Sequence, residues 1–267
     1  MNHDSPAILR QSDILDPARA QTFLAALGRS DKVSAGDALL PFFHQLYFWD
    51  PQPPSALGRD GHPKVGGAIP DMGLPRRMWA GGQLEFFAPL CAGEVATKTT
   101  ALKSANHKNG RSGPLAFATL CHEVTQGRTL CVREFQDLVY REDPDPAVPM
   151  PAVPMARTDE VFAETQAFDS TLLFRYSALT FNGHRIHYDL DYARDVEGYG
   201  GLVVHGPLLA QLLMLMAERQ LGALKRFAFR AVSPLMHFET ATFCWRKDGA
   251  CWVRGPDGRQ IMTAKAE

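Results

Sequence analysis

Hydrophobic positions divide the chain into two halves, and each half predicts a helix followed by strands. In the first half, apolar residues recur on nearly every helical turn between Asp37 and Tyr47, which predicts a buried helix that ends at Asp50-Pro51. Four strand patterns follow it, separated by breaks that contain glycine: residues 84–87, 94–102, 115–124 and 129–140. One buried helix and about four antiparallel strands predict a sheet packed on a helix.

The second half predicts a long apolar helix that begins at Pro207 and continues to about Leu221, where Gly222 ends it. Four strand patterns follow this helix: residues 226–232, 237–246, 250–254 and 260–265. Asp248-Gly249 and Asp257-Gly258 predict hairpin turns between the last three of them. Because both halves repeat the order of helix and then strands, the sequence predicts a duplicated α+β fold.

Prolines and helix-cap residues predict four segments along the chain. Asp16-Pro17 is typical of a cap and first turn, here for a helix over residues 18–27 in a leader segment. Five prolines in the twelve residues 143–154 predict a stiff, extended linker. We therefore expect a leader helix, an N-terminal domain, a Pro-rich linker and a C-terminal domain at residues 1–34, 35–142, 143–156 and 157–267.

A long segment rich in Pro and Gly, residues 52–77, separates the first predicted helix from its strands. Loops of this length inside a compact domain are uncommon, and many of them are functional lids or binding segments. An irregular surface connection is the alternative, and the sequence leaves both open.

Composition and charge exclude several classes of protein. The 267 residues are 45% hydrophobic and 21% charged with a net charge of −1, which is typical of a soluble globular protein. Without an overall positive field, neither nucleic acid nor an anionic membrane is an expected partner. The five cysteines lack CxxC spacing, which argues against a disulfide framework or a zinc site. Since we find no secretory signal and no apolar run long enough to cross a membrane, we expect a cytoplasmic protein.

Polar side chains suited to chemistry cluster within residues 176–189, before the second predicted helix. The group comprises Asn182, His184, Arg185, His187 and Asp189. Imidazole titrates near neutral pH, and the first turn of a helix exposes unpaired N–H groups that favour negative charge. The combination predicts proton transfer on a substrate with a polarised carbonyl. The alternatives are structural histidines and, at Gly206-Pro207, a tight first turn and nothing more.

A metal site at His184, His187 and Asp189 is another interpretation of the same residues. Two histidines three residues apart fit one face of a helix, but Gly183 and the Tyr188-Asp189 step predict a loop or a short turn. No further cluster of ligands is visible in the sequence. We therefore expect no metal and no cofactor.

The segment Leu-Thr-Phe-Asn-Gly-His-Arg-Ile-His at residues 179–187 resembles the hydratase motif of MaoC-like (R)-specific enoyl-CoA hydratases. That motif places an Asp and a His five residues apart, before a His-Gly step at the central helix, as at His205-Gly206. The sequence is more similar to the double-hotdog 3-hydroxyacyl-thioester dehydratase group, which includes itaconyl-CoA and mesaconyl-CoA hydratases. Residues 75–87 and 107–114 resemble the N-terminal domain of that group, so the resemblance spans about residues 35–265.

The resemblance implies a double hotdog, in which two long helices are each wrapped by an antiparallel sheet. It also implies a hydro-lyase that adds water reversibly to an enoyl-CoA thioester. His187 would be the acid and base, and the Gly206 N–H would bind the thioester oxygen. Asn182 occupies the place of the Asp of the (R)-hydratases; an amide cannot take a proton, but it can orient water or the thioester. His187 would then act alone, or share the task with Asp189 or His184.

Substrate contacts are expected at several further residues. Arg185 is a candidate for a substrate carboxylate, with an ion pair to Asp189 or Asp191 as the alternative. His184 and His205 are expected near the substrate. The candidates for CoA phosphates, which are equally explained as solvated surface charges, are Arg76, Arg77, Lys103, Lys108 and Arg111.

Three functions follow from the resemblance, and the acyl group distinguishes two of them. An itaconyl-CoA or mesaconyl-CoA type hydratase is favoured over a fatty-acyl 3-hydroxyacyl-thioester dehydratase. A basic residue opposite His187 would indicate a dicarboxylate substrate, whereas an apolar tunnel would indicate a fatty chain. A non-catalytic acyl-thioester-binding protein is the third, and Asn182 is the main argument for it; a thioesterase is a weaker alternative. The partner is an acyl-CoA thioester in each case, and a homodimer is compatible with the sequence.

Overall fold

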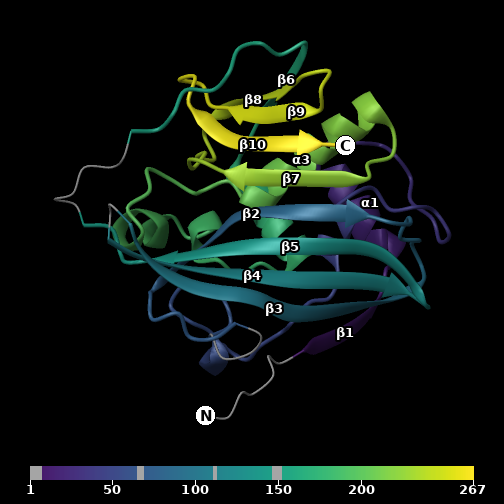
Figure 1. Ribbon diagram of the computed structural model, residues 1–267, viewed down its shortest axis with the longest axis horizontal. Coiled ribbons are helices and arrows are strands. Elements are labelled where there is room, and N and C mark those ends of the chain that lie inside the picture. Colours follow the sequence, from purple (N-terminus) through teal and green to yellow (C-terminus); the bar gives the residue numbers. More distant parts are fainter. Residues whose placement is uncertain (1–7, 65–68, 111–112, 146–151) are drawn as a thin grey trace.

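The computed structural model describes residues 8–64, 69–110, 113–145 and 152–267, and within these residues it contains one ten-stranded sheet (Figure 1). Its strand order is β1-β3-β4-β5-β2-β7-β10-β9-β8-β6, and all neighbours are antiparallel. The strands are β1 Leu9–Ile14, β2 Arg76–Phe86, β3 Val95–Gly110, β4 Gly113–Gln126, β5 Thr129–Arg141, β6 Phe162–Ala167, β7 Arg226–Ala231, β8 Thr240–Trp245, β9 Ala250–Arg254 and β10 Gln260–Ala266. The helices are α1 Pro17–Ala26, α2 Ser170–Thr180 and α3 Gly206–Leu221, with short helical turns η1 Phe43–Leu46, η2 Pro54–Ala56, η3 Arg185–His187 and η4 Tyr192–Val196.

The two halves of the sheet repeat one order of elements, as the sequence predicts. The first half runs β1, α1 and then β2 to β5, and the second runs β6, α2, α3 and then β7 to β10. Strands β2 and β7 pair from Gly81 opposite Arg230 to Glu85 opposite Arg226, so the halves form one continuous sheet. The eight predicted strand patterns correspond to β2–β5 and β7–β10, whereas the two edge strands β1 and β6 and the helix α2 were not predicted.

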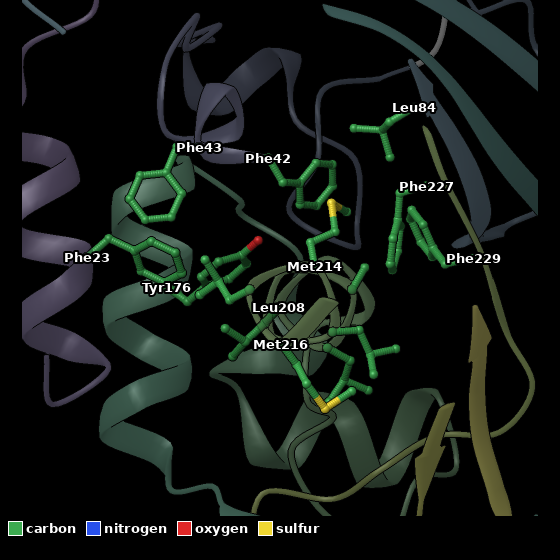
Figure 2. Close-up of a cluster of buried hydrophobic side chains, with 14 of the residues drawn as sticks. Phe23, Phe42, Phe43, Leu84, Tyr176, Leu208, Met214, Met216, Phe227 and Phe229 are labelled. Atoms are coloured by element: carbon green, nitrogen blue, oxygen red, sulfur yellow. The ribbon is translucent and has the colours of Figure 1, made fainter. Parts of the chain in front are cut away.

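Helix α3 is the centre of the hydrophobic core. Pro207 lies in its first turn, and Gly222 ends it with φ of 81°, a conformation that glycine adopts without strain. Figure 2 shows Leu208, Met214 and Met216 of α3 surrounded by aromatic side chains from both halves. Each of these three side chains is completely buried. The helix predicted to begin at Pro207 is therefore confirmed.

The helix predicted to begin near Asp37 is wrong. The chain there is irregular, and only the 3-10 turn η1, Phe43–Leu46, is helical. Phe42 and Phe48 have φ of 70° and 61°, in the left-handed region that interrupts a right-handed helix. The apolar residues are nonetheless buried as the pattern requires, and Gln211 of α3 donates a hydrogen bond to the Pro41 carbonyl at 2.8 Å. Tertiary packing satisfies the hydrophobic pattern here without a helix.

The leader segment and the linker differ in how far the structure describes them. Helix α1 is present with its predicted cap, since Asp16 Oδ1 accepts a hydrogen bond from the Ala18 N–H at 2.8 Å. In the proline-rich segment, residues 146–151 lie outside the described residues, and the four domain boundaries stay a prediction. No helix in the described part of the chain is both long and apolar enough to span a membrane.

Candidate active site

A cavity of about 1160 Å³ lies where β2 extends beyond the end of β7. Strand β7 pairs with β2 only from Gly81 to Glu85, so residues 76–80 of β2 have no strand of the second half beside them in the described structure. The cavity is lined by β2, β4, β5, β7 and β10, by the loop at residues 182–187 and by the start of α3. Both halves therefore contribute to it.

His187 lines this cavity in a fixed tautomer. Its Nδ1 lies 2.7 Å from the Val203 carbonyl oxygen, and because a carbonyl only accepts, Nδ1 carries the proton. Nε2 is then left with its lone pair. Burial, together with the nearby His184, lowers the pKa of His187 to about 3, so the ring is neutral at neutral pH. The hydrogen bond from Nδ1 to the Val203 backbone therefore fixes the ring, and Nε2 is a proton acceptor.

His205 supports the His187 ring from behind. The two rings are stacked, with centroids 3.6 Å apart and an interplanar angle of 19°. His205 is completely buried, its Nε2 lies 2.8 Å from Ser177 Oγ, and burial holds its pKa well below the usual range. His205 was expected to contact the substrate, but it is not among the residues that line the cavity. It lies behind His187, which does line the cavity.

Gly206 is the first residue of α3 and lines the cavity. The first N–H groups of a helix have no acceptor within the helix, and Pro207 has no N–H, so within the described structure Gly206 supplies an unpaired donor at the start of α3. His205, at the N-cap, makes no capping hydrogen bond through its side chain. The helix dipole adds positive potential at this point. The site can stabilise a developing negative charge on a thioester oxygen.

Asn182 lines the cavity two residues after α2 ends. Its Oδ1 accepts a hydrogen bond from the His184 backbone N–H at 3.0 Å, which fixes the orientation of the amide. The Nδ2 group, with two donors, is then available to the cavity. Asn182 can hold the oxygen of a water or a hydroxyl group but cannot remove its proton.

A buried ion pair between the halves positions His184. Arg76 Nε donates to Glu197 Oε2 at 2.8 Å, and His184 Nε2 lies 3.8 Å from Glu197 Oε1. Burial tends to raise the pKa of Glu197, but the nearby His184 and the charge of Arg76 lower it to about 2. Arg76, a candidate for CoA phosphates, instead pairs with a carboxylate and is not among the cavity-lining residues.

Arg185 lies outside the cavity, in a smaller surface depression. Its Nη2 is 2.7 Å from Asp189 Oδ2, and its guanidinium lies over the Tyr192 ring at 4.3 Å from the centroid. Of the two interpretations that the sequence left open, the ion pair is therefore the one present. Asp189 is not among the residues that line the cavity, so it is not placed to share proton transfer there.

The proline- and glycine-rich segment of residues 52–77 contributes three cavity residues, His62, Ile69 and Arg77. The loop around Gly61 packs so closely on Gly183 that a Cβ at Gly61 would lie 2.1 Å from the Gly183 carbonyl oxygen. This contact brings the His62 ring to 4.9 Å from the His184 ring. Burial and the charge of Arg77 hold the pKa of His62 well below its usual range. Sequence reasoning missed His62, although its glycine-rich loop was recognised as a candidate binding segment.

The remaining candidates lie elsewhere. Lys103 and Lys108 do not line the cavity, Lys108 lies over the Phe117 ring, and Arg111 is outside the described residues. Among the residues that the structure describes, no three His, Cys, Asp or Glu side chains are grouped in a way that could hold a metal ion.

Comparison with known proteins identifies relatives along most of the chain. The family described as hydroxyacyl-thioester dehydratase type 2 matches residues 42–237. The mesaconyl-C(4)-CoA hydratase of Chloroflexus aurantiacus is 42% identical over 241 residues, which cover 88% of this chain and 85% of the relative. The mitochondrial hydroxyacyl-thioester dehydratase type 2 of Schizosaccharomyces pombe is 26% identical, with 81% and 80% covered.

Solved structures show the same fold. A MaoC-like dehydratase from Phytophthora capsici has a TM-score of 0.71 at 16% identity, with 98% of this chain and 95% of that one covered. HtdX of Mycobacterium tuberculosis has a TM-score of 0.68 at 18% identity, with 97% and 98% covered. A further Mycobacterium tuberculosis protein, with a TM-score of 0.62, is described as a double hotdog. The α+β double-hotdog fold is confirmed, and the chain belongs to the hydroxyacyl-thioester dehydratase type 2 family.

Proposed function

We propose that the protein catalyses the reversible addition of water to the double bond of an enoyl-CoA thioester, with a dicarboxylic acyl group of the mesaconyl or itaconyl type. One observation carries the reaction: a neutral His187 with a bare Nε2 and the free N–H of Gly206 line the same cavity. The 42% identity to a mesaconyl-C(4)-CoA hydratase supports the acyl group.

In the proposed hydration step, each group has its own role. The Gly206 N–H binds the thioester oxygen and stabilises the negative charge that develops there. Asn182 Nδ2 donates to the water, and His187 Nε2 removes a proton as the water oxygen bonds to C3. The protonated His187 then returns that proton to C2, so one O–H bond and the C2–C3 π bond break while one C–O and one C–H bond form. Dehydration is the same path in reverse.

Hydration assays on a panel of enoyl-CoA esters test this proposal. Mesaconyl-CoA, itaconyl-CoA, crotonyl-CoA and a long-chain enoyl-CoA would be incubated with the purified protein and with His187→Ala, and loss of enoyl absorbance measured. We expect turnover of the dicarboxylic esters by the wild type and a rate about 10³-fold lower with the variant. A preference for the long chain would favour the fatty-acyl dehydratase, as the name of the Schizosaccharomyces pombe relative suggests.

Two outcomes would reject the enzyme assignment. If the protein bound the esters but hydrated none of them, it would be an acyl-thioester-binding protein. If free CoA thiol were released, it would be a thioesterase.

The cytoplasmic location and the homodimer remain proposals that rest on the sequence. Light scattering on the purified protein tests the dimer, and cell fractionation tests the location. A monomer in solution would leave the site intact, because both halves that form the cavity belong to one chain.

A further inference from the structure

The charged residues that line the cavity are mostly cationic. Among the described residues, the lining contains four cationic side chains and a single acidic one: Arg77, Arg141, Arg230, Lys265 and Asp137. A cavity with this balance attracts anions. A dicarboxylic acyl-CoA carries anions at both ends, the acyl carboxylate and the CoA phosphates, so the position of each cation decides which end it meets.

Strand register places these cations on opposite faces of the sheet. Arg77 of β2 pairs with Tyr140 of β5, which is buried in a core cluster with Leu138. Since residues directly opposite on paired strands share a face, Arg77 lies on this inner face. Arg141 follows Tyr140 and therefore points to the outer face, because side chains alternate along a strand.

Arg230 and Lys265 also belong to the outer face. Arg230 is exposed and follows the buried Phe229 on β7. It pairs with Thr263 on β10, two residues before the exposed Lys265, so the three side chains share one face. Arg77 is thus the one cation on the inner face of the sheet among the described lining residues.

The guanidinium of Arg77 has few partners. Its side chain is 16% exposed, and its one ion-pair contact among the described residues is Asp60 Oδ2 at 3.6 Å, longer than a hydrogen bond. A guanidinium has five N–H donors in a planar fork, so most remain available. Beside it, the buried Tyr140 hydroxyl faces the Arg77 guanidinium, and no acceptor for its O–H is present in the described structure. A buried hydroxyl without an acceptor, next to a guanidinium with unused donors, indicates room for an anion.

A chain of contacts connects Arg77 with the reacting groups. Asp60, its partner, also accepts a hydrogen bond from the His62 backbone N–H at 3.1 Å through Oδ1. The His62 ring lies 4.9 Å from the His184 ring, and the His184 ring lies 5.4 Å from the His187 ring. These contacts place Arg77 beside the loops that carry His62 and His184, on the first-half side of the cavity.

We propose that Arg77, with the Tyr140 hydroxyl, binds the free carboxylate of a dicarboxylic acyl group, while Arg141, Arg230 and Lys265 meet the CoA phosphates. This rests on the proposed function and names the residue that selects its substrate class. The fork of Arg77 matches the two oxygens of a carboxylate, and a charge-assisted pair in a buried cavity is strong. A monocarboxylic enoyl-CoA leaves the guanidinium without this partner.

Selectivity between matched esters tests the proposal. For Arg77→Gln, we expect kcat/KM for mesaconyl-CoA to fall about 100-fold or more, whereas kcat/KM for crotonyl-CoA stays within about threefold. Arg77→Lys keeps the charge but loses the planar fork. Its kcat/KM for mesaconyl-CoA should therefore lie between that of the wild type and that of Arg77→Gln. Circular dichroism would verify that each variant is folded.

Arg230→Gln is the matched control, because it removes the same charge from the outer face. It should raise KM for both CoA esters alike and leave their ratio unchanged. With pantetheine thioesters, which lack the nucleotide phosphates, Arg230→Gln should have no effect, while Arg77→Gln should still discriminate against the dicarboxylic ester.

Two results would overturn the assignment of Arg77. One is an unchanged mesaconyl-to-crotonyl ratio in Arg77→Gln. The other is an equal loss for both CoA esters that disappears with pantetheine esters, which would make Arg77 a phosphate ligand. If the wild type hydrated no ester, the proposed function would fail instead. Calorimetric binding of the saturated analogues methylsuccinyl-CoA and butyryl-CoA would then still report on Arg77.

Discussion

The two halves of the sheet share a strand order but differ in the layer that covers it. In the second half, the 16-residue helix α3 fills the space, and Gly206 in its first turn lines the cavity. In the first half, irregular chain around η1 fills the equivalent space with side chains such as Phe42 and Phe43, each 1% exposed. Both layers bury apolar surface equally well, but only a long helix offers aligned free N–H groups at its start.

The polar clusters of the two halves differ in access. In the first half, His44 Nε2 and Glu134 Oε2 are 2.8 Å apart, with side chains 2% and 1% exposed, and neither residue lines the cavity. Burial tends to raise the pKa of Glu134, but the hydrogen bond with His44 lowers it. In the second half, His184 and His187 line the cavity. Similar residue types are structural in one half and available to a substrate in the other.

The sharpest way to break this comparison is to remove one histidine from each half. His187→Ala should lower kcat by about 10³-fold, because general acid–base catalysis typically contributes 10²–10⁴. His44→Ala should remove the imidazole partner of the buried Glu134, leave it the hydrogen bond from Gln45, and lower the free energy of unfolding by about 3–5 kcal/mol. Steady-state kinetics and urea denaturation measure the two effects. Loss of kcat in a stable His44→Ala protein would show that the first-half cluster takes part in catalysis.

The ion pair that joins the halves should contribute to stability. Glu197→Gln leaves the charge of Arg76 buried and should lower the free energy of unfolding by about 3 kcal/mol. The folded-state pKa of Glu197 is about 2, below the ordinary value of 4.5. The stability from this group is therefore present above pH 4.5 and is lost as pH falls toward 2.

Urea denaturation at several pH values measures this dependence. The wild type should lose stability more steeply than Glu197→Gln between pH 4.5 and 2. Parallel curves for the two proteins over that range would exclude a contribution from Glu197.

Asn182 should have a smaller effect than His187, because it orients and does not transfer a proton. Asn182→Ala should lower kcat about tenfold, the equivalent of about one hydrogen bond. Asn182→Asp retains the acceptor for the His184 N–H and should keep partial activity. An increase in kcat with Asp, measured at saturating substrate, would show instead that the missing carboxylate limits the enzyme.

The smallest expected effect concerns pH: kcat/KM should show no titration of His187 in the neutral range. Because burial lowers the pKa of His187 to about 3, the neutral base is fully present throughout the neutral range. The profile of kcat/KM should therefore be flat between about pH 5 and 8, without a step near the ordinary histidine pKa of about 6.5. A step at that value would mean that a solvated histidine controls the reaction.

The elements that the sequence predicted well are those that local rules determine. Helix α3 has continuous apolar periodicity, a proline in its first turn and a glycine at its end, and the hairpin glycines Gly249 and Gly258 both have φ of 84°. The helix near Asp37 failed because the same apolar spacing is buried equally well by irregular chain. Helix α2 was missed although its cap, Asp169, accepts a hydrogen bond from the Leu172 N–H at 2.7 Å.

The site divides in the same way. Asn182, His187 and Gly206 lie within 25 residues, and the motif around them is a local signal. The motif does not predict where each side chain points. Arg185 forms an ion pair with Asp189, and Arg76 pairs with Glu197, which lies 121 residues later in the sequence. The contribution of the segment at residues 58–77 depends on contacts between the halves, which periodicity and spacing do not reveal.

The linker between the halves has a consequence for symmetry. In a dimer of two identical hotdog chains, a two-fold axis would place every substitution at two equivalent positions. Here the equivalent strands β2 and β7 belong to one chain, so Arg77 on β2 is present once and needs no counterpart on β7. The second half can then supply α3 and the proton carrier His187, while the first half supplies the residue proposed to bind the acyl carboxylate. Covalent duplication thus permits an asymmetric active site at a symmetric junction.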